Sequence, residues 1–243
     1  MPRFFVDKEN ISDASLKIIG EDAFHIARSL RMAVGDTIDL CDGEGMGYHC
    51  RLTRIRDDEC ECEILGSEAG QSESPASITL FMAYPKGDKL ETVIQKAVEL
   101  GASSIVPFES SRCIKRPKAE KLDRQLERLN KIAKEAAKQC GRSRLPKVFA
   151  PLSFSEMLKN AALFETAVFC YENEDGRSIK DLISGKKPQS ISVIVGSEGG
   201  FSPDEVESAI SAGLTPVTLG KRILRCETAP SAALSMIAYE LEL

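Results

Sequence analysis

Two stretches in the C-terminal third of the chain place glycines beside charged residues in an order that suits ligand binding. The first is G-S-E-G-G at residues 196–200, which follows the apolar run at 191–195. Ser202 and Glu205 then form a capping-box pattern around Pro203, a favoured first residue of a helix. This order predicts a strand, a glycine loop and a helix. In parallel sheets, loops at the carboxyl ends of strands hold ligands.

The charges of this loop argue against a phosphate ligand. The stretch matches neither G-x-x-x-x-G-K-[ST] nor G-x-G-x-x-G, and no lysine follows its glycines. Glu198, Asp204 and Glu205 would repel phosphate at a helix N-terminus, where anions usually bind. A neutral or cationic ligand fits better, and S-adenosylmethionine, with its sulfonium cation and adenine, is one such ligand. A tight structural turn is the alternative.

The second stretch is L-G-K-R-I-L-R-C-E-T-A at residues 219–229, after another predicted strand. Its apolar pair, Ile223 and Leu224, lies between charged residues, as in a loop that packs inward and presents polar ends. Alone, this pattern does not define a site.

Two regions with different hydrophobic patterns must position these loops. Residues 1–65 contain short alternating runs, a hairpin-turn pattern at 42–45 and one short helical pattern near 21–30, which together predict a small β-barrel. Residues 66–76 are polar and small, as linkers are. We therefore expect two domains, at 1–70 and 75–243.

After the linker, strand patterns alternate with helical patterns, which predicts an α/β domain with a mostly parallel sheet covered on both faces. Strands are expected at 78–84, 104–108, 166–171, 191–195 and 216–219. Helices are expected at 90–100, from Pro117 to Gly141, after the capping-box pattern of Ser153 and Glu156, and at 229–241.

The composition, with 42% hydrophobic and 28% charged residues, is typical of a soluble globular protein. The chain has no apolar run long enough for a bilayer and no signal-peptide pattern at its N-terminus, so we expect a cytoplasmic protein without a membrane partner. The eight cysteines lack zinc-knuckle spacing, and the chain has only two histidines. We expect buried free thiols and no metal.

Charge is distributed unevenly along the chain. Residues 112–147 hold 13 Lys and Arg against 4 Asp and Glu, a local charge of +9 within a chain whose total is −5. The remainder therefore carries −14. Such segregation predicts a face suited to a polyanion, and a solvated basic helix is the alternative.

Together, G-S-E-G-G-F-S-P-D-E and L-G-K-R-I-L-R-C-E-T-A resemble the SPOUT methyltransferases, and the closer match is the RsmE family. R-F-F-V, L-R-M-A-V-G-D after His25, K-G-D-K-L-E-T-V-I-Q-K-A-V-E-L-G and E-A-A-K-Q-C-G-R-S-R-L-P match this family as well. The similarity covers nearly the whole chain. The main departure is Ser197, where the family usually has proline.

This resemblance implies an N-terminal PUA-like RNA-binding β-barrel and a C-terminal SPOUT α/β domain with a deep trefoil knot. It implies S-adenosylmethionine-dependent methylation of N3 of one uridine in 16S ribosomal RNA, as naked RNA or in the 30S subunit. It also implies a homodimer with active sites at the subunit interface. The implied cofactor residues are Tyr171, Gly196, Ser197, Glu198, Gly199, Gly200, Leu219, Gly220, Ile223, Leu224, Arg225, Cys226, Thr228 and Ala229.

Methylation of uracil N3 requires an unpaired base and removal of the N3 proton, which leaves negative charge on the uracil oxygens. A fixed guanidinium would stabilise this charge, and Arg225 is the first candidate for that role. Glu198 or Glu227 could accept the proton or orient the base. A salt bridge from Arg225 to one of these glutamates is the structural alternative.

Basic residues in both domains are the expected RNA contacts: Arg3, Arg28, Arg31, Lys86, Arg112, Arg142 and Arg144. Two other functions stay open from the sequence. One is a non-catalytic RNA-binding assembly factor. The other is a SPOUT enzyme that acts on another RNA, for example by 2′-O-methylation of tRNA or rRNA.

Overall fold

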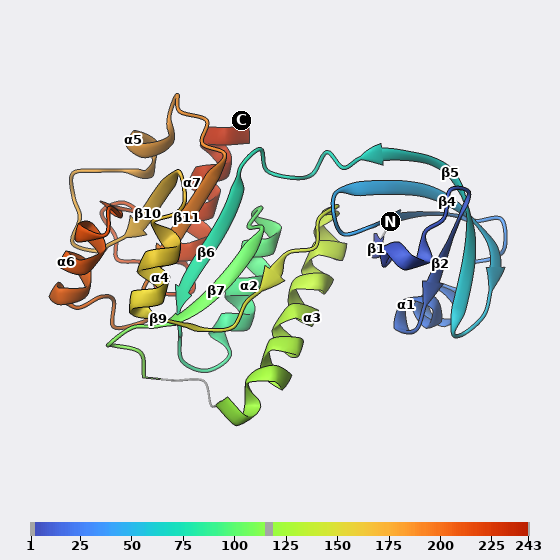
Figure 1. Ribbon diagram of the computed structural model, residues 1–243, viewed down its shortest axis with the longest axis horizontal. Helices are drawn as coiled ribbons and strands as arrows, with labels where there is room; N and C mark the ends of the chain where they lie inside the picture. The colour runs from blue at the N-terminus through green and yellow to red at the C-terminus, as the bar shows by residue number, and fades with distance from the viewer. Residues whose placement is uncertain (1–2, 115–118, 243) are drawn as a thin grey trace. The chain divides into compact units, whose positions relative to one another are not determined.

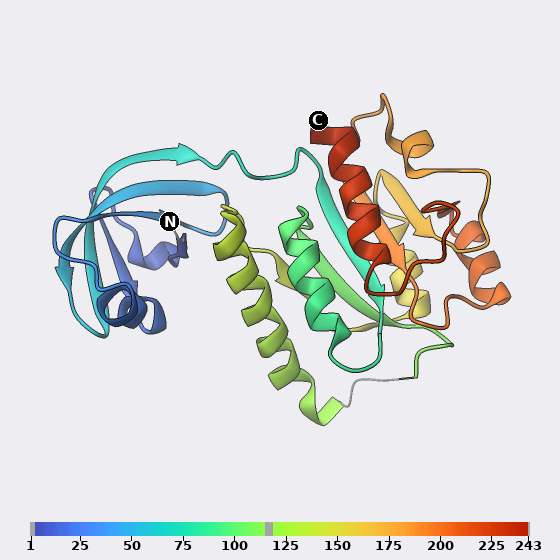
Figure 2. The same ribbon diagram turned by 180° about the vertical axis from the view of Figure 1, so that it is seen from behind.

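The computed structural model describes residues 3–114 and 119–242, so the expected helix start at Pro117 lies outside the described residues. The chain forms two compact units (Figures 1 and 2). Unit 1 comprises Met1–Glu73 and Ala137–Leu145, and unit 2 comprises Ser74–Ala136 and Pro146–Leu243. None of the described helices is both long and apolar enough to cross a membrane.

Unit 1 is built on an open sheet with the order β1-β3-β4-β5-β2. Its inward side chains alternate with exposed ones, as in β2, where Leu16 and Ile18 are buried between exposed neighbours. The elements are β1 (Phe4–Phe5), η1 (Lys8–Asn10), β2 (Ser15–Ile19), α1 (Glu21–Phe24), η2 (His25–Ser29), β3 (Thr37–Cys41), β4 (Met46–Ile55) and β5 (Glu59–Ala69).

The local features expected of unit 1 are confirmed. The predicted hairpin turn joins β3 to β4, where the Asp42 carboxylate accepts hydrogen bonds from the backbone of Glu44 and Met46. The short helix near 21–30 is one α-helical turn continued by a π-helical turn. All eight cysteines are free, and all except Cys140 are buried.

The expected linker at 66–76 is partly wrong, because β5 continues to Ala69 and pairs there with Met46 of β4. The strand persists because backbone pairing with β4 needs no apolar side chains. Register shifts between His49 and Cys50 and between Leu52 and Arg54 mark irregularities in this long pair of strands.

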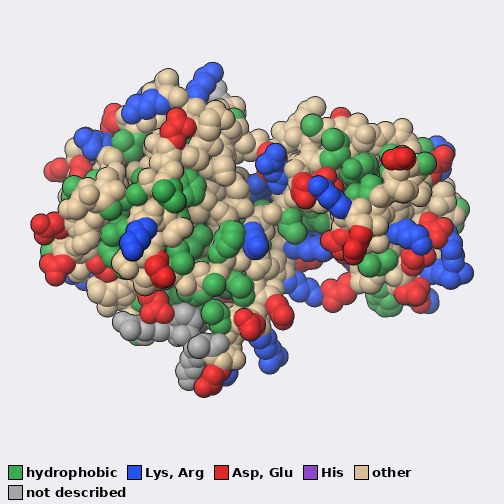
Figure 3. All heavy atoms as spheres, viewed as in Figure 1, with side chains coloured by type: hydrophobic (Ala, Val, Ile, Leu, Met, Phe, Trp, Pro, Cys, Tyr) green, Lys and Arg blue, Asp and Glu red, His purple; other side chains and the backbone are tan. Residues whose placement is uncertain are grey.

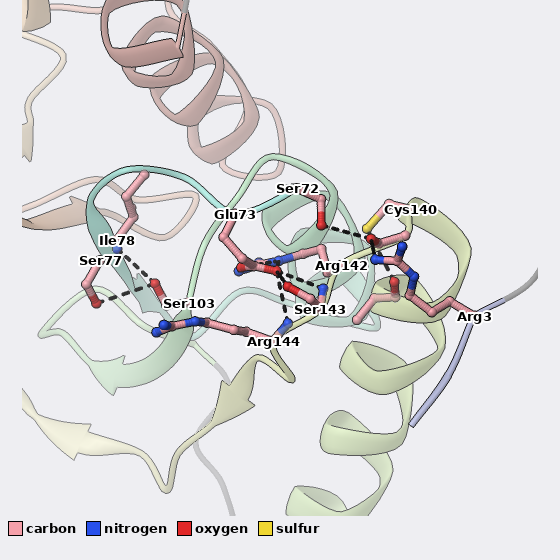
Figure 4. A network of polar contacts seen from close by, with 12 residues as sticks. Arg3, Ser72, Glu73, Ser77, Ile78, Ser103, Cys140, Arg142, Ser143 and Arg144 are labelled. Carbon is pink, nitrogen blue, oxygen red and sulfur yellow. Dashed lines mark hydrogen bonds and ion pairs between the residues drawn. The ribbon is translucent and has the colours of Figure 1, made fainter. Parts of the chain in front are cut away.

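The segment after the long helix packs against Ser72 and Glu73, which follow β5, within unit 1 (Figure 4). The Glu73 carboxylate accepts hydrogen bonds from the Arg142 guanidinium at 2.5 Å and from the backbone N–H groups of Ser143 and Arg144 at 2.9 and 3.0 Å. The Arg142 side chain is only 5% exposed. Residues 137–145 therefore pack with the first unit, although they lie within the expected domain at 75–243.

Gly70 lies against this segment so closely that a larger residue would not fit. A β-carbon at Gly70 would lie 2.2 Å from the Cβ of buried Ser143, whereas one at Gly66 would meet nothing within 4 Å. We expect Gly70→Ala to lower the free energy of unfolding by about 1–3 kcal/mol. The control Gly66→Ala should stay within about 0.5 kcal/mol of the parent. Urea unfolding of both variants measures the difference, and equal midpoints would contradict it.

Unit 2 contains a parallel sheet with the order β12-β10-β11-β6-β7-β8, and β9 also pairs with β7. Helices α2 and α7 cover one face and α4 covers the other (Figures 1 and 2). The strands are β6 (Ser77–Ala83), β7 (Ser104–Glu109), β8 (Lys147–Val148), β9 (Leu152–Ser153), β10 (Thr166–Cys170), β11 (Ser190–Val195) and β12 (Thr215–Val217).

The helices of unit 2 begin and end close to the positions that the capping patterns predict. They are α2 (Lys89–Glu99), α4 (Phe154–Ala161), α5 (Ile179–Ile183), α6 (Pro203–Ser211) and α7 (Ala229–Glu242), while η3 (Ala119–Lys121) leads into α3 (Leu122–Cys140), whose last turn belongs to unit 1. The capping boxes of Ser153 with Glu156 and of Ser202 with Glu205 are both formed. Helix α5, strand β8 and strand β9 were not expected. The trefoil knot stays a prediction.

Candidate functional site

Three adjacent strands of unit 2 end beside one another and so bring both predicted loops to one edge of the sheet. The order β12-β10-β11 places the ends of these parallel strands, at Val217, Cys170 and Val195, side by side. The glycine loop follows β11, and residues 218–228 follow β12. The sheet topology, rather than sequence proximity, therefore creates a common site.

The two loops line a pocket with a volume of about 540 Å³, within the range of small-molecule sites. Every expected cofactor residue lines it except Thr228, whose backbone N–H instead donates to the Arg225 carbonyl at the start of α7. The expected catalytic residues Arg225, Glu198 and Glu227 line it as well. Four further lining residues, Cys170, Glu172, Lys221 and Arg222, belong to the expected stretches around Tyr171 and from Leu219 to Ala229. The sequence did not point to the remaining three, Lys89, Val195 and Thr218.

The glycine loop is held in a conformation that larger residues would disturb. Gly200 has a φ of 61°, and its N–H donates to the Ser197 carbonyl at 3.0 Å. A β-carbon at Gly199 would lie 2.9 Å from the Cβ of Arg112, whose guanidinium donates to the Gly199 carbonyl at 2.8 Å. The next residue, Phe201, is buried against Phe169, with ring centroids 4.5 Å apart.

A buried carboxylate anchors the helix that follows the loop. Glu205 is 7% exposed, and its side chain closes the capping box on Ser202. The same carboxylate accepts a hydrogen bond from the Ser111 backbone at 2.7 Å. Glu205 is therefore a structural acid that joins α6 to the chain after β7, and its charge is not directed at a ligand.

Ser197 is a buried polar residue in the pocket wall. Its residue exposure is 6%, and its hydroxyl has no hydrogen-bond partner among the described residues. A buried hydroxyl without a partner loses its hydration and gains no hydrogen bond in return. The pocket wall thus contains an unused polar group where most family members, by the resemblance above, have proline.

Both glutamates of the site bind one lysine. The Lys89 ammonium lies 3.0 Å from the Glu198 carboxylate and 3.1 Å from the Glu227 carboxylate. Within the part of the chain that the structure describes, neither glutamate is paired with Arg225. The salt bridge that was the structural alternative for Arg225 is therefore wrong, and its exposed guanidinium lines the pocket.

These contacts hold all three groups in their charged forms. Burial acts to raise the pKa of Glu198, but its own backbone N–H and the Lys89 ammonium outweigh this and keep that pKa below its ordinary value. The pKa of Glu227 is also lowered, first by its own backbone N–H and then by Cys226 and Lys89. Hydrogen bonds to Glu198 and Glu227 raise the pKa of Lys89 to about 12. A carboxylate stabilised in this way is a weak proton acceptor.

Sequence comparisons agree with this site. A family model described as an RNA methyltransferase domain matches residues 72–238, and one described as an RNA methyltransferase PUA domain matches residues 18–65. The chain is 36% identical over its whole length to ribosomal RNA small subunit methyltransferase E of Bacillus subtilis and covers 98% of that protein. The chain belongs to the RNA methyltransferase family.

Two solved structures have the same fold as this RNA methyltransferase. One is a ribosomal RNA small subunit methyltransferase E from Neisseria gonorrhoeae bound to S-adenosyl methionine, with 33% identity, a TM-score of 0.88 and coverage of 98% of this chain and 97% of that one. The other, from Legionella pneumophila in complex with the bound cofactor SAM, has 28% identity, a TM-score of 0.86 and coverage of 98% and 96%. The expected combination of a PUA-like unit and a parallel α/β methyltransferase unit is confirmed, with an open half-barrel sheet in unit 1.

The expected RNA contacts of the methyltransferase have different environments. Arg142 does not suit this role, because its guanidinium is buried against Glu73. The Arg112 guanidinium donates to the Gly199 carbonyl in the glycine loop, and the backbone N–H of Lys86 donates to the Glu198 carboxylate. Both residues are therefore next to the pocket. Arg144 is exposed, with only its backbone bound to Glu73.

In unit 1, the expected RNA contacts are partly engaged within the protein. Arg28 is exposed but forms a two-pronged ion pair with Asp57, at 2.8 and 2.6 Å. Arg3 donates to the Gly141 carbonyl at 2.7 Å. Arg31 is exposed and has a positive φ of 52°.

Acids from outside the basic stretch neutralise part of its charge. Lys138 pairs with Asp22 at 2.7 Å, Arg142 with Glu73 at 2.5 Å, and Arg128 with Glu91 at 2.8 Å. Acidic and basic side chains are also interspersed on the face drawn in Figure 3. The charge count along the sequence therefore overstates the positive field of this segment.

Proposed function

We propose that this protein is an S-adenosylmethionine-dependent methyltransferase of the bacterial small ribosomal subunit that methylates N3 of one uridine in 16S rRNA. The observation that carries the proposal is the pocket in which both family motifs meet at the ends of β10, β11 and β12. The names of the relatives support the class of RNA substrate. We also propose that the enzyme works in the cytoplasm as a homodimer.

The pocket residues fit S-adenosylmethionine. Backbone groups of the glycine loop line the pocket and can meet polar atoms of a nucleoside. Glu172 supplies negative charge for a cationic ligand, whereas Glu198 and Glu227 are paired with Lys89. Two structural relatives contain this cofactor. When bound, it supplies an electrophilic methyl group on a sulfonium.

The residues of the chain would then orient the base and stabilise its charge. The backbone carbonyl of Arg225 accepts hydrogen bonds from Thr228 and Ala229, both at 2.9 Å, which fixes this residue at the N-terminus of α7. Its exposed guanidinium can bind the uracil oxygens as the N3 proton passes to solvent water. Glu198 and Glu227 are engaged by Lys89, and this arrangement favours orientation of the site over proton abstraction.

The decisive experiment transfers labelled methyl groups to 30S subunits that lack the modification, beside naked 16S rRNA and tRNA. Mass spectrometry then maps the methylated atom. We expect one N3-methyluridine in 16S rRNA and none in tRNA. A 2′-O-methyl product would replace the proposal by the activity of another SPOUT enzyme. Calorimetric titration with S-adenosylmethionine separates both from a non-catalytic assembly factor, which would bind no cofactor.

A further inference from the structure

Lys89 is the first residue of α2 and lies far along the chain from both pocket loops. Its ammonium contacts Glu198 in the loop after β11 and Glu227 in the loop after β12, at 3.0 and 3.1 Å. The Cys226 thiol lies 3.9 Å from the same nitrogen. One side chain from a third element thus joins the two walls of the pocket.

No other polar contact joins these two loops within the described residues. The remaining hydrogen bonds of the glycine loop run within the loop, to Arg112 or to the Lys86 backbone. Those of residues 218–228 run within that segment, to α7 or to the Arg177 carbonyl. The spacing of the loops therefore depends on Lys89 and on packing.

A single exposed ion pair contributes little, because solvent screens it and ordering two side chains costs entropy. The Lys89 contacts differ in two respects. The side chains of Lys89, Glu198 and Glu227 are only 36%, 27% and 25% exposed, and one ammonium binds two carboxylates. The Lys86 backbone also fixes Glu198, at 3.1 Å. Networks of this kind hold geometry better than isolated pairs do.

We propose that Lys89 is a positioning residue that holds the two pocket loops at a fixed spacing, so that the cofactor pocket is formed before ligand binding. Glu198 and Glu227 then serve as the anchor points of Lys89 in the two loops. This inference concerns the same site as the proposed function and rests on it for the identity of the ligand. The loop spacing itself is testable without any ligand.

The variant Lys89→Met keeps most of the side-chain volume and removes the charge. We expect faster backbone hydrogen exchange in both 196–200 and 218–228 of the free protein, because each loop loses its anchor. If the fraction of free molecules with a preformed pocket falls to about a tenth, the Kd for S-adenosylhomocysteine rises about tenfold. The kcat at saturating cofactor should change much less. Lys89→Arg, which can also bind two carboxylates, should restore most of the affinity.

Lys17→Met is a matched control in the other unit. Lys17 also lies between two carboxylates, with Glu59 at 3.3 Å and Glu61 at 3.9 Å, but both belong to the single strand β5. Lys17→Met should leave backbone hydrogen exchange in the two pocket loops and the Kd for S-adenosylhomocysteine unchanged. If Lys89→Met does not fold, Glu198→Gln and Glu227→Gln each remove one of the two ion pairs of Lys89. Each variant should speed backbone hydrogen exchange mainly in the loop that carries the substitution.

The outcomes separate the inference from the proposed function. Unchanged exchange in both loops of Lys89→Met would overturn the positioning role, whatever the ligand is. Faster exchange in both loops, with a raised Kd that Lys89→Arg restores, would support it. If the parent protein bound neither S-adenosylmethionine nor S-adenosylhomocysteine, the proposed function would fail, and the exchange comparison alone would decide the role of Lys89.

Discussion

Arg225→Ala is expected to lower kcat for methyl transfer by about 10²–10³-fold, the usual cost of removing one group that stabilises developing negative charge. The Kd for S-adenosylmethionine should change by less than about threefold, because the guanidinium acts on the uracil oxygens and not on the cofactor. Single-turnover rates with saturating cofactor and calorimetric titration measure the two quantities separately.

Two further variants test whether the guanidinium itself is responsible. Arg225→Lys keeps the charge but loses the planar pair of donors, so we expect only partial recovery of kcat. Lys186→Ala removes one exposed positive charge outside the pocket and should leave kcat at the parent level. A catalytic role for Arg225 would be excluded if Arg225→Ala turned over as fast as the parent.

Glu73→Ala is expected to reduce the free energy of unfolding by about 3–5 kcal/mol, as for other broken buried ion pairs. The substitution removes the acceptor that Arg142 and the backbone of Ser143 and Arg144 share. Glu63→Ala is the matched control, because Glu63 pairs with Arg51 at 3.6 Å with both side chains about half exposed. Glu63→Ala should lower the free energy of unfolding by less than about 1 kcal/mol. Urea denaturation at pH 7 gives both values.

The Glu73 contribution should also depend on pH. Burial acts to raise the pKa of Glu73, but Arg142 and the two backbone donors outweigh it and hold that pKa below its ordinary value. A lowered folded-state pKa means that the stabilisation is complete above the unfolded pKa of about 4.3 and is lost as the pH falls through the folded value. The stability difference between the parent and Glu73→Gln should therefore be constant from pH 6 to 8 and shrink below about pH 4. A difference that grew on acidification would contradict this sign.

The sequence located the two pocket loops because their signals are local. Apolar runs that end in glycine mark strand ends, and Ser202 with Glu205 marks a helix start. The sequence could not supply the strand order, and Lys89 was missed for that reason. Strand β6 pairs with β11, with Met82 opposite Val195, so the segment that follows β6 reaches Glu198. The only hint of Lys89 in the sequence was the K-G-D-K run at residues 86–89, which resembles the family.

Arg142 shows the opposite error. Its position in a basic stretch suggested phosphate binding, but a residue's neighbours in sequence do not determine its burial. The fold brings Glu73 from 69 residues away to its guanidinium. The prediction of a linker at residues 66–76 was partly wrong for the same reason, because polar residues 66–69 still form the end of β5 by pairing with β4. Long-range pairing overrides local composition in both cases.

The division of the chain has a consequence for its synthesis. Unit 1 includes Ala137–Leu145, and the Glu73 carboxylate has its partners at residues 142–144. A nascent chain that has exposed only its first 73 residues therefore lacks the segment that completes its first unit. We expect that unit to become protease-resistant on the ribosome only after residue 145 has left the exit tunnel, when α3 is already made. Completion of the N-terminal unit is thus delayed until α3, whose last turn belongs to that unit, has been synthesised.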